Sequence, residues 1–141
     1  MKRLLPIFKA SFFVPLFGDG STKFQPVFID DVSLAVDEII NSNIKGKNIY
    51  ELAGPRIYSY KEFFNHISNF LNKTRVFVPV PMGLMKPMIS IAEKTPISPL
   101  TSEQLTLFEK DNLLVNIDKS FQNLDINPQD TLQILKNIVV N

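Results

Sequence analysis

The fold is decided by residues 18–32, which read Gly18-Asp19-Gly20-Ser21-Thr22-Lys23-Phe24-Gln25-Pro26-Val27-Phe28-Ile29-Asp30-Asp31-Val32. The glycines of Gly18-Asp19-Gly20 tolerate positive φ, so this tripeptide predicts a turn. Val27-Phe28-Ile29 then predicts a short buried strand. Asp30 or Asp31 predicts the N-cap of a helix that runs from Asp31 to Ser42. A turn, a strand and an acidic helix start therefore follow one another.

Strands and helices alternate in the rest of the chain. The apolar runs 12–17, 49–53 and 75–80 predict strands. Two capping boxes, Ser59 with Glu62 and Thr101 with Gln104, predict helix starts, and a Met-rich helix at 82–93 is expected to kink or start late at Pro87. Pro96 and Pro99 predict a loop, and Asn127-Pro128 predicts the start of a terminal helix. This alternation indicates an α/β fold, or α+β for the isolated chain, in one domain over 1–141.

Apolar residues at helical spacing predict the buried stripes of two helices. The stripe of the helix that starts at Asp31 consists of Val32, Ala35, Val36, Ile39 and Ile40. The stripe behind the Ser59–Glu62 box consists of Phe63, Phe64, Ile67, Phe70 and Leu71.

Composition excludes several classes of function. With 141 residues and 45% hydrophobic residues, the chain can bury the core of one globular domain. Fifteen basic and 14 acidic side chains are scattered and give a net charge of +1, so no nucleic acid is expected as a partner. The chain has no cysteine and one histidine, His66, which is expected to be a surface or boundary residue. No metal site is predicted.

The N-terminus resembles a secretory signal because Lys2 and Arg3 precede an apolar stretch. Lys9 and two prolines interrupt that stretch, and no small-residue cleavage site follows it. No run reaches the ~18 apolar residues that a membrane-spanning helix needs. We therefore expect a cytoplasmic protein without a signal peptide or a transmembrane segment.

Five strings in one order carry a family resemblance: GDGSTKFQPVFIDDV, YELAGP, SYKEF, PLTSEQ and DN. Together they resemble the C-terminal part of the atypical extended short-chain dehydrogenase/reductases, a family similar to NAD-dependent epimerases and dehydratases. Within that family, the chain is most similar to the nucleotide-binding accessory subunit of respiratory complex I and its bacterial relatives. The resemblance implies the substrate-side portion of an extended Rossmann-type fold, without its nucleotide-binding half. The cofactor of the parent family is NAD(P).

The resemblance also implies a substrate cleft. It places the stretch around Phe24, Gln25 and Pro26, with Phe28, at that cleft, although a Gln beside a strand is often only a surface or strand-end residue. Asp31 matches the acidic residue that starts the following helix, where an N-cap is the simpler interpretation. Relatives that bind nucleotide sugars place an arginine near Phe24, whereas the nearest cation here is Lys23, which does not reproduce the bidentate fork of arginine.

The catalytic and cofactor motifs of the family do not occur in the sequence. There is no Gly-x-Gly-x-x-Gly turn to hold a pyrophosphate, so the chain is expected to bind no cofactor by itself. The family uses a Tyr and a Lys four residues apart. The residues four positions after the three tyrosines are Gly54, Glu62 and Phe64. No catalytic residue is therefore predicted, and Asp30 with Asp31, or Glu51 near Arg56, are expected to be capping or surface charges.

Two hypotheses about function remain open. In the first, the chain is a non-catalytic docking portion, or a truncated gene product, that associates with a larger assembly such as a respiratory complex, peripheral to the inner membrane. In the second, it is one half of a split NAD(P)-dependent oxidoreductase or epimerase, completed by a separately encoded Rossmann chain. The strand at 49–53 is expected to leave an unpaired edge, which also favours a homo-oligomer. The methionines at 82, 85 and 88 fit either core packing or an adaptable contact.

Overall fold

A computed structural model describes residues 5–42, 45–94, 101–115 and 119–140 of the chain. The helices are α1 (Leu5–Ala10), α2 (Ile29–Asn41), α3 (Tyr60–Phe70), α4 (Met82–Ala92), α5 (Ser102–Leu105) and α6 (Thr131–Val140), with 3-10 turns η1 (Thr106–Phe108) and η3 (Phe121–Leu124). The strands are β1 (Phe13–Phe17), β2 (Lys23–Phe24), β3 (Tyr58–Ser59) and β4 (Val76–Val80). This mixture of helices and strands confirms the predicted α/β class.

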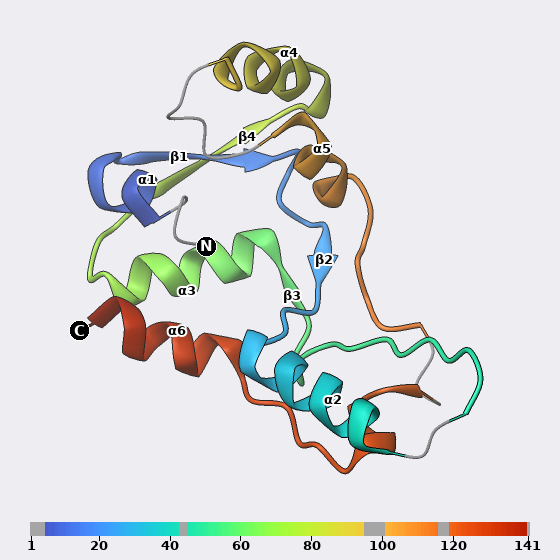
Figure 1. Cartoon of the computed structure of the whole chain (residues 1–141). Helices are drawn as coiled ribbons and strands as arrows, with labels where there is room; N and C mark the ends of the chain where they lie inside the picture. The colour runs from blue at the N-terminus through green and yellow to red at the C-terminus, as the bar shows by residue number, and fades with distance from the viewer. Residues whose placement is uncertain (1–4, 43–44, 95–100, 116–118, 141) are drawn as a thin grey trace.

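A two-stranded parallel sheet organises one end of the molecule. β1 pairs with β4 in a register that runs from Phe13 opposite Val76 to Phe17 opposite Val80. In Figure 1, α3 lies on one side of this sheet and α4 on the other. The strands predicted at 12–17 and 75–80 are therefore confirmed, and the turn after β1 has positive φ at Gly18 (61°) and Gly20 (77°). β2 and β3 form a second, antiparallel pair.

Helix α3 provides the centre of the main core. Its predicted capping box is present: the Glu62 N–H donates to the Ser59 hydroxyl, and the Ser59 N–H donates to the Glu62 carboxylate. The next turns bury Phe63, Phe64 and Ile67, as predicted. The Phe64 ring lies edge-on to that of Phe8 in α1, with centroids 5.1 Å apart. Helix α3 thus joins α1, β1 and β4 in one aromatic core.

A smaller cluster lies between α2 and η3. Its buried members are Ala35, Phe121 and Leu124. Half-buried apolar residues from α2 and from three loops pack around them, namely Val27, Val32, Ile39, Tyr50, Leu52 and Ile126. Val36 and Ile40, which the periodicity placed in the buried stripe, are 48% and 75% exposed. The buried face of α2 is therefore narrower than predicted.

Two predicted strands are wrong. Residues 27–28 and 49–53 belong to no strand, and Ile29 is the first residue of α2. Ile29 and Ile49 are 67% and 70% exposed instead of buried. A strand needs a neighbour for its backbone N–H and C=O groups, and among the described residues no strand pairs with either segment. An apolar, β-branched sequence was therefore not sufficient to form a strand at either segment.

Helix ends differ from the predictions at two further places. Helix α6 begins at Thr131 instead of next to Asn127, because the Asp130 carboxylate accepts the Leu132 N–H and caps the helix there. Helix α4 starts at Met82 and continues through Pro87, so the late start is wrong. The Thr101–Gln104 box is present in front of α5, and the loop predicted at Pro96 and Pro99 lies outside the described residues.

Candidate functional site

The candidate site is a pocket of about 610 Å³ that is formed by loop segments. Four parts of the chain meet there: Gln25 after β2, the segment 53–55, Leu114 and the segment 120–128 around η3. Its volume lies within the range of about 300–1,000 Å³ that small-molecule sites occupy. Polar and apolar residues share the lining, and its polar side chains are Gln25, Ser120, Gln122, Asp125 and Asn127.

Gln25 holds three of these segments together. Its Nε2 donates to the Gly54 carbonyl at 2.8 Å, and its Oε1 accepts the Leu114 N–H at 3.2 Å. Both ends of the carboxamide are therefore in use within the protein. Gln25 lines the pocket, and its two hydrogen bonds also fix the shape of the pocket wall. Its role at a substrate cleft stays a prediction.

Gly54 is required by the close approach of another backbone. A Cβ atom at this position would lie 1.9 Å from the Pro26 carbonyl oxygen, a distance that no side chain can accept. The same carbonyl accepts the Thr131 hydroxyl at 3.0 Å, which ties this loop to the start of α6. Pro26 therefore acts behind the pocket wall through its backbone.

Asp31 is not the N-cap that the sequence predicts. The N-cap of α2 is Phe28, which makes no side-chain capping bond, and Asp31 is the third residue of the helix. Its side chain is 1% exposed and accepts the Gln129 N–H at 2.8 Å and the Gln129 Nε2 at 3.2 Å. A carboxylate in the first turn remains favourable for the helix dipole. Asp31 thus anchors the loop 127–129, which borders the pocket, to α2.

The other predicted cleft residues lie elsewhere. The Phe24 ring is stacked on Tyr60, with centroids 4.3 Å apart and planes 12° apart, and lies edge-on to Phe63. Phe28 is half-buried in front of α2. Among the four predicted residues, only Gln25 lines the pocket. The Lys23 N–H donates to the Asp111 carboxylate at 2.8 Å, so this residue joins β2 to the loop at 111–114.

Tyr58 and Tyr60, which precede and begin α3, have raised pKa values. Burial raises the pKa of Tyr60 to about 12. Burial, followed by the charge of Asp130, raises the pKa of Tyr58, whose hydroxyl donates to Asp130 at 3.3 Å. A tyrosine that exchanges a proton near neutral pH needs the opposite shift.

The remaining candidates for chemistry have structural partners. Arg56 pairs with Asp130 at 3.1 Å, and the Glu51 carboxylate accepts the Val115 N–H at 3.0 Å, so Glu51 and Arg56 are not paired with each other. His66 is exposed on α3, with its ring near Tyr58 and Phe70. Within the part of the chain that the structure describes, no three His, Asp or Glu side chains are grouped to hold a metal ion. No helix in that part is long and apolar enough to cross a bilayer.

Sequence reasoning missed most of the pocket lining. Leu114 and the segment 120–128 come from turns and loops that have no periodic pattern, so only their contacts reveal them. One residue type fits its place: Asp is enriched at positive φ, and Asp125, which follows η3, has a φ of 52°.

Comparisons with known proteins relate this sequence to mitochondrial proteins. No protein-family model matches the chain. It is 30% identical over 128 residues to the mitochondrial NADH dehydrogenase (ubiquinone) 1 alpha subcomplex subunit 9 of Arabidopsis thaliana. This match covers 82% of this chain and 31% of the Arabidopsis protein. It is 27% identical over 109 residues to the mitochondrial NADH-ubiquinone oxidoreductase 40 kDa subunit of Neurospora crassa, covering 77% of this chain and 29% of that protein. The chain thus spans less than a third of these relatives.

The fold is similar to that of a larger reductase. Two solved structures of the triphenylmethane reductase of Citrobacter sp. match with TM-scores of 0.71 and 0.69 at 16% identity, the second being a complex with NADP(H). They cover 96% and 95% of this chain but only 47% and 46% of the reductase. The ordered motifs, the related sequences and the shared fold agree: this chain is similar in sequence to accessory subunits of complex I, and it has the fold of a part of a short-chain dehydrogenase-like reductase.

Proposed function

We propose that this chain is the substrate-side and docking portion of an NAD(P)-binding short-chain dehydrogenase-like protein and that it does not catalyse a reaction by itself. One observation carries the proposal: an exposed apolar margin borders the pocket, where the predicted strand at 49–53 finds no partner strand among the described residues. The margin is defined by Ile49 and Val115, which are 70% and 88% exposed.

Hydrogen bonds hold the two parts of the margin side by side. The Glu51 N–H donates to the Lys119 carbonyl at 2.9 Å, and the Val115 N–H donates to the Glu51 carboxylate at 3.0 Å. Lys119 also donates its ammonium group to the Asn48 side chain at 2.7 Å. The segment 48–51, drawn in green-blue at the right of Figure 1, therefore lies beside Val115 and Lys119. This arrangement presents Ile49 and Val115 on fixed backbone.

The position of the margin favours a nucleotide-binding half as its partner. The chain corresponds to slightly less than half of the triphenylmethane reductase. Parallel sheets in such folds are normally covered on both faces, and exposed apolar residues in a group mark interaction sites. Leu114, which lines the pocket, directly precedes Val115 of the margin, and Ala53, another lining residue, follows Ile49 by four residues. A nucleotide-binding half docked here, on the same polypeptide or a separate one, would close the pocket from outside.

Association with a respiratory assembly is the second part of the proposal. Both curated relatives are named as subunits of mitochondrial NADH-ubiquinone oxidoreductases. A related chain with an exposed apolar margin is suited to such a complex, at the periphery of the inner membrane. A docking role is also consistent with the tyrosines at the start of α3, since burial raises the pKa of Tyr58 and raises that of Tyr60 to about 12.

A split NAD(P)-dependent enzyme is the alternative function. It is favoured by the likeness to a reductase solved with NADP(H), of which this chain matches 46%. In that case a separate chain would supply the pyrophosphate-binding turn and the Tyr/Lys pair. The two functions differ in one result: the split enzyme gains NADPH oxidation when a nucleotide-binding chain is added, whereas the docking portion forms a complex that stays inactive.

The self-association of the purified chain tests the apolar margin. We expect gel filtration with light scattering to show dimers or larger species that increase with concentration. Ile49→Lys should shift the chain to a monomer, because it puts a charge into the contact. The matched control is Ile138→Lys, since Ile138 is 61% exposed on α6 at the other end of the molecule. A wild-type chain that is monodisperse and monomeric at high micromolar concentration would contradict the proposal.

Cofactor binding tests the non-catalytic part of the proposal. Titration calorimetry of the chain alone with NADH and with NADPH should give no micromolar binding, because the pyrophosphate site of this fold class lies in the nucleotide-binding half. Micromolar affinity for either cofactor would refute it.

A further inference from the structure

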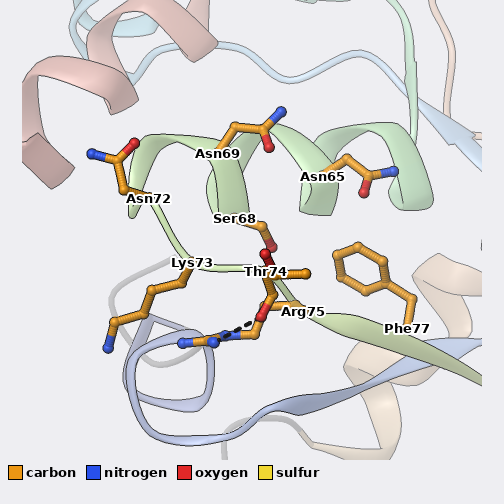
Figure 2. A pocket seen from close by; sticks show the side chains of 8 residues that line it. All are labelled: Asn65, Ser68, Asn69, Asn72, Lys73, Thr74, Arg75 and Phe77. Atoms are coloured by element: carbon orange, nitrogen blue, oxygen red, sulfur yellow. Dashed lines mark hydrogen bonds between the residues drawn. The ribbon is translucent and has the colours of Figure 1, made fainter.

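A second pocket, of about 510 Å³, lies at the junction of α3 and β4 (Figure 2). It shares no lining residue with the pocket at Gln25. Its lining consists of Asn65, Ser68, Asn69, Asn72, Lys73, Thr74, Arg75 and Phe77. Seven of these eight residues are polar or charged, and none of them belongs to the pocket at Gln25 or to the margin of the proposed function.

Ser68 gives this pocket an unpaired polar group in its wall. The residue is 5% exposed, and its hydroxyl oxygen is buried without a hydrogen-bond partner among the described residues. In Figure 2 the hydroxyl points from α3 toward the segment that carries Thr74. Buried hydroxyl groups in proteins are nearly always paired, and an unpaired one calls for a ligand or a bound water.

Two cations of the pocket have no acidic partner. Lys73 donates to the Lys9 carbonyl and Arg75 donates to the Phe8 carbonyl, both at 2.8 Å, so they cap the end of α1. Carbonyl groups are dipoles and leave the two positive charges uncompensated. Neither residue takes part in the two ion pairs of the described structure, and no lining residue is acidic.

The lining therefore offers many donors and a positive charge. Lys73 uses one of its three N–H donors on α1. Arg75 uses three of its five, two on the Phe8 carbonyl and one on the Thr74 carbonyl, so each side chain keeps two N–H donors. The three asparagine carboxamides and the Ser68 and Thr74 hydroxyls add further donors. A phosphate group, with a negative charge and several acceptor oxygens, matches this set.

We propose that the pocket between α3 and β4 binds a small soluble phosphate monoester, whose phosphate contacts Ser68, Thr74 and Arg75 and whose organic part lies against the Phe77 ring. This proposal does not depend on the docking function. A phosphate on the headgroup of a lipid would have the same chemistry, so the test separates the two sources.

The test is an NMR titration of the ¹⁵N-labelled chain with glycerol 3-phosphate and, separately, with inorganic phosphate. We expect saturable shifts in the amide signals of residues 65–77, beyond those caused by sodium chloride at equal ionic strength. Ser68→Ala should weaken binding, and Asn72→Asp should weaken it about tenfold by adding a negative charge, equivalent to 1.4 kcal/mol. Asn72 has a φ of 51°, which Asp also tolerates, so the fold is kept. The control is Asn112→Asp, an exposed asparagine outside the pocket.

Several outcomes would overturn the proposal. Shifts no larger than those with sodium chloride would show a general salt effect. Equal affinity of the wild type and Asn72→Asp would place the phosphate elsewhere. Sedimentation with vesicles of phosphatidic acid and phosphatidylcholine, without binding of glycerol 3-phosphate, would identify a lipid surface instead of a soluble ligand.

Discussion

The aromatic core around α3 and the smaller cluster between α2 and η3 differ in how well sequence patterns describe them. In the core, both predicted strands and the Ser59–Glu62 box form as expected. In the smaller cluster, the predicted strands at 27–29 and 49–53 do not form, and Asp31 has a different role. The two regions have equally clear sequence patterns. The two regions differ in whether the described residues contain a neighbouring strand for each predicted strand.

In the core, partners are supplied within the chain. β1 and β4 satisfy each other, and α3 covers them with its apolar stripe. The segment 49–53 has one backbone bond from Glu51 to Lys119 but no neighbouring strand among the described residues. A pattern that is typical of a strand therefore gives a strand only when another strand lies beside it.

The largest expected effect is in the aromatic core. Phe64 is 3% exposed and its ring lies near those of Phe8, Phe17, Tyr60 and Phe77. Phe64→Ala should lower the free energy of unfolding by about 3–5 kcal/mol, because it removes buried surface and leaves a cavity. Phe121→Ala in the smaller cluster should cost less, since loops there can collapse around the gap. Urea denaturation measures both, and an equal loss would remove the contrast between the regions.

The second effect is a backbone clash at the candidate pocket. Gly54→Ala places a methyl group against the Pro26 carbonyl oxygen and should cost about 3 kcal/mol, at the upper end for overpacking. Gly83→Ala is the matched control, because a Cβ there meets no atom within 4 Å and alanine favours the helix. Thermal unfolding followed by circular dichroism compares the variants. If Gly54→Ala were as stable as wild type, the loop 53–55 would not be held against Pro26.

The third prediction separates two roles of Asp31: the contact with Gln129, and a general effect of negative charge at the start of α2. Asp31→Ala leaves the Gln129 N–H without its buried acceptor and should cost about 1–3 kcal/mol. Asp30→Ala, an exposed change in the same turn, should alter stability by less than about 0.5 kcal/mol. The denaturant midpoints of the two variants measure the two losses of stability. Equal losses would favour a general charge effect at the helix start over the Asp31–Gln129 contact.

The smallest effect concerns the capping box of α3. Ser59→Ala should cost about 1 kcal/mol at neutral pH. The Ser59 N–H and then its hydroxyl lower the pKa of Glu62, so the folded pKa lies below the unfolded one. The contribution of this carboxylate is therefore complete above an unfolded pKa of about 4.3 and is lost as the pH falls through the folded value. Glu62→Gln should weaken this acid dependence, as measured by unfolding between neutral pH and pH about 3. An unchanged pH profile would contradict the role of Glu62.

The family resemblance and the candidate pocket share one residue. Gln25 was named from the family resemblance, and it does line the pocket. Phe24 was named on the same ground, but its ring stacks on Tyr60 in the core. The opposing wall at 120–128 consists of loops whose positions depend on contacts such as Asp31 with Gln129, which no local pattern encodes.

The sequence by itself determined the local starts and stripes: the turn at Gly18–Gly20, the capping boxes at Ser59 and Thr101, and the buried face of α3. These depend on interactions between residues a few positions apart, so the same residues give them in any context. Tertiary structure alone decided that 49–53 is not a strand, that Asp31 holds Gln129, and that Gly54 must lack a side chain. Each of these depends on an atom from a distant part of the chain, or on a partner strand that the described residues do not contain.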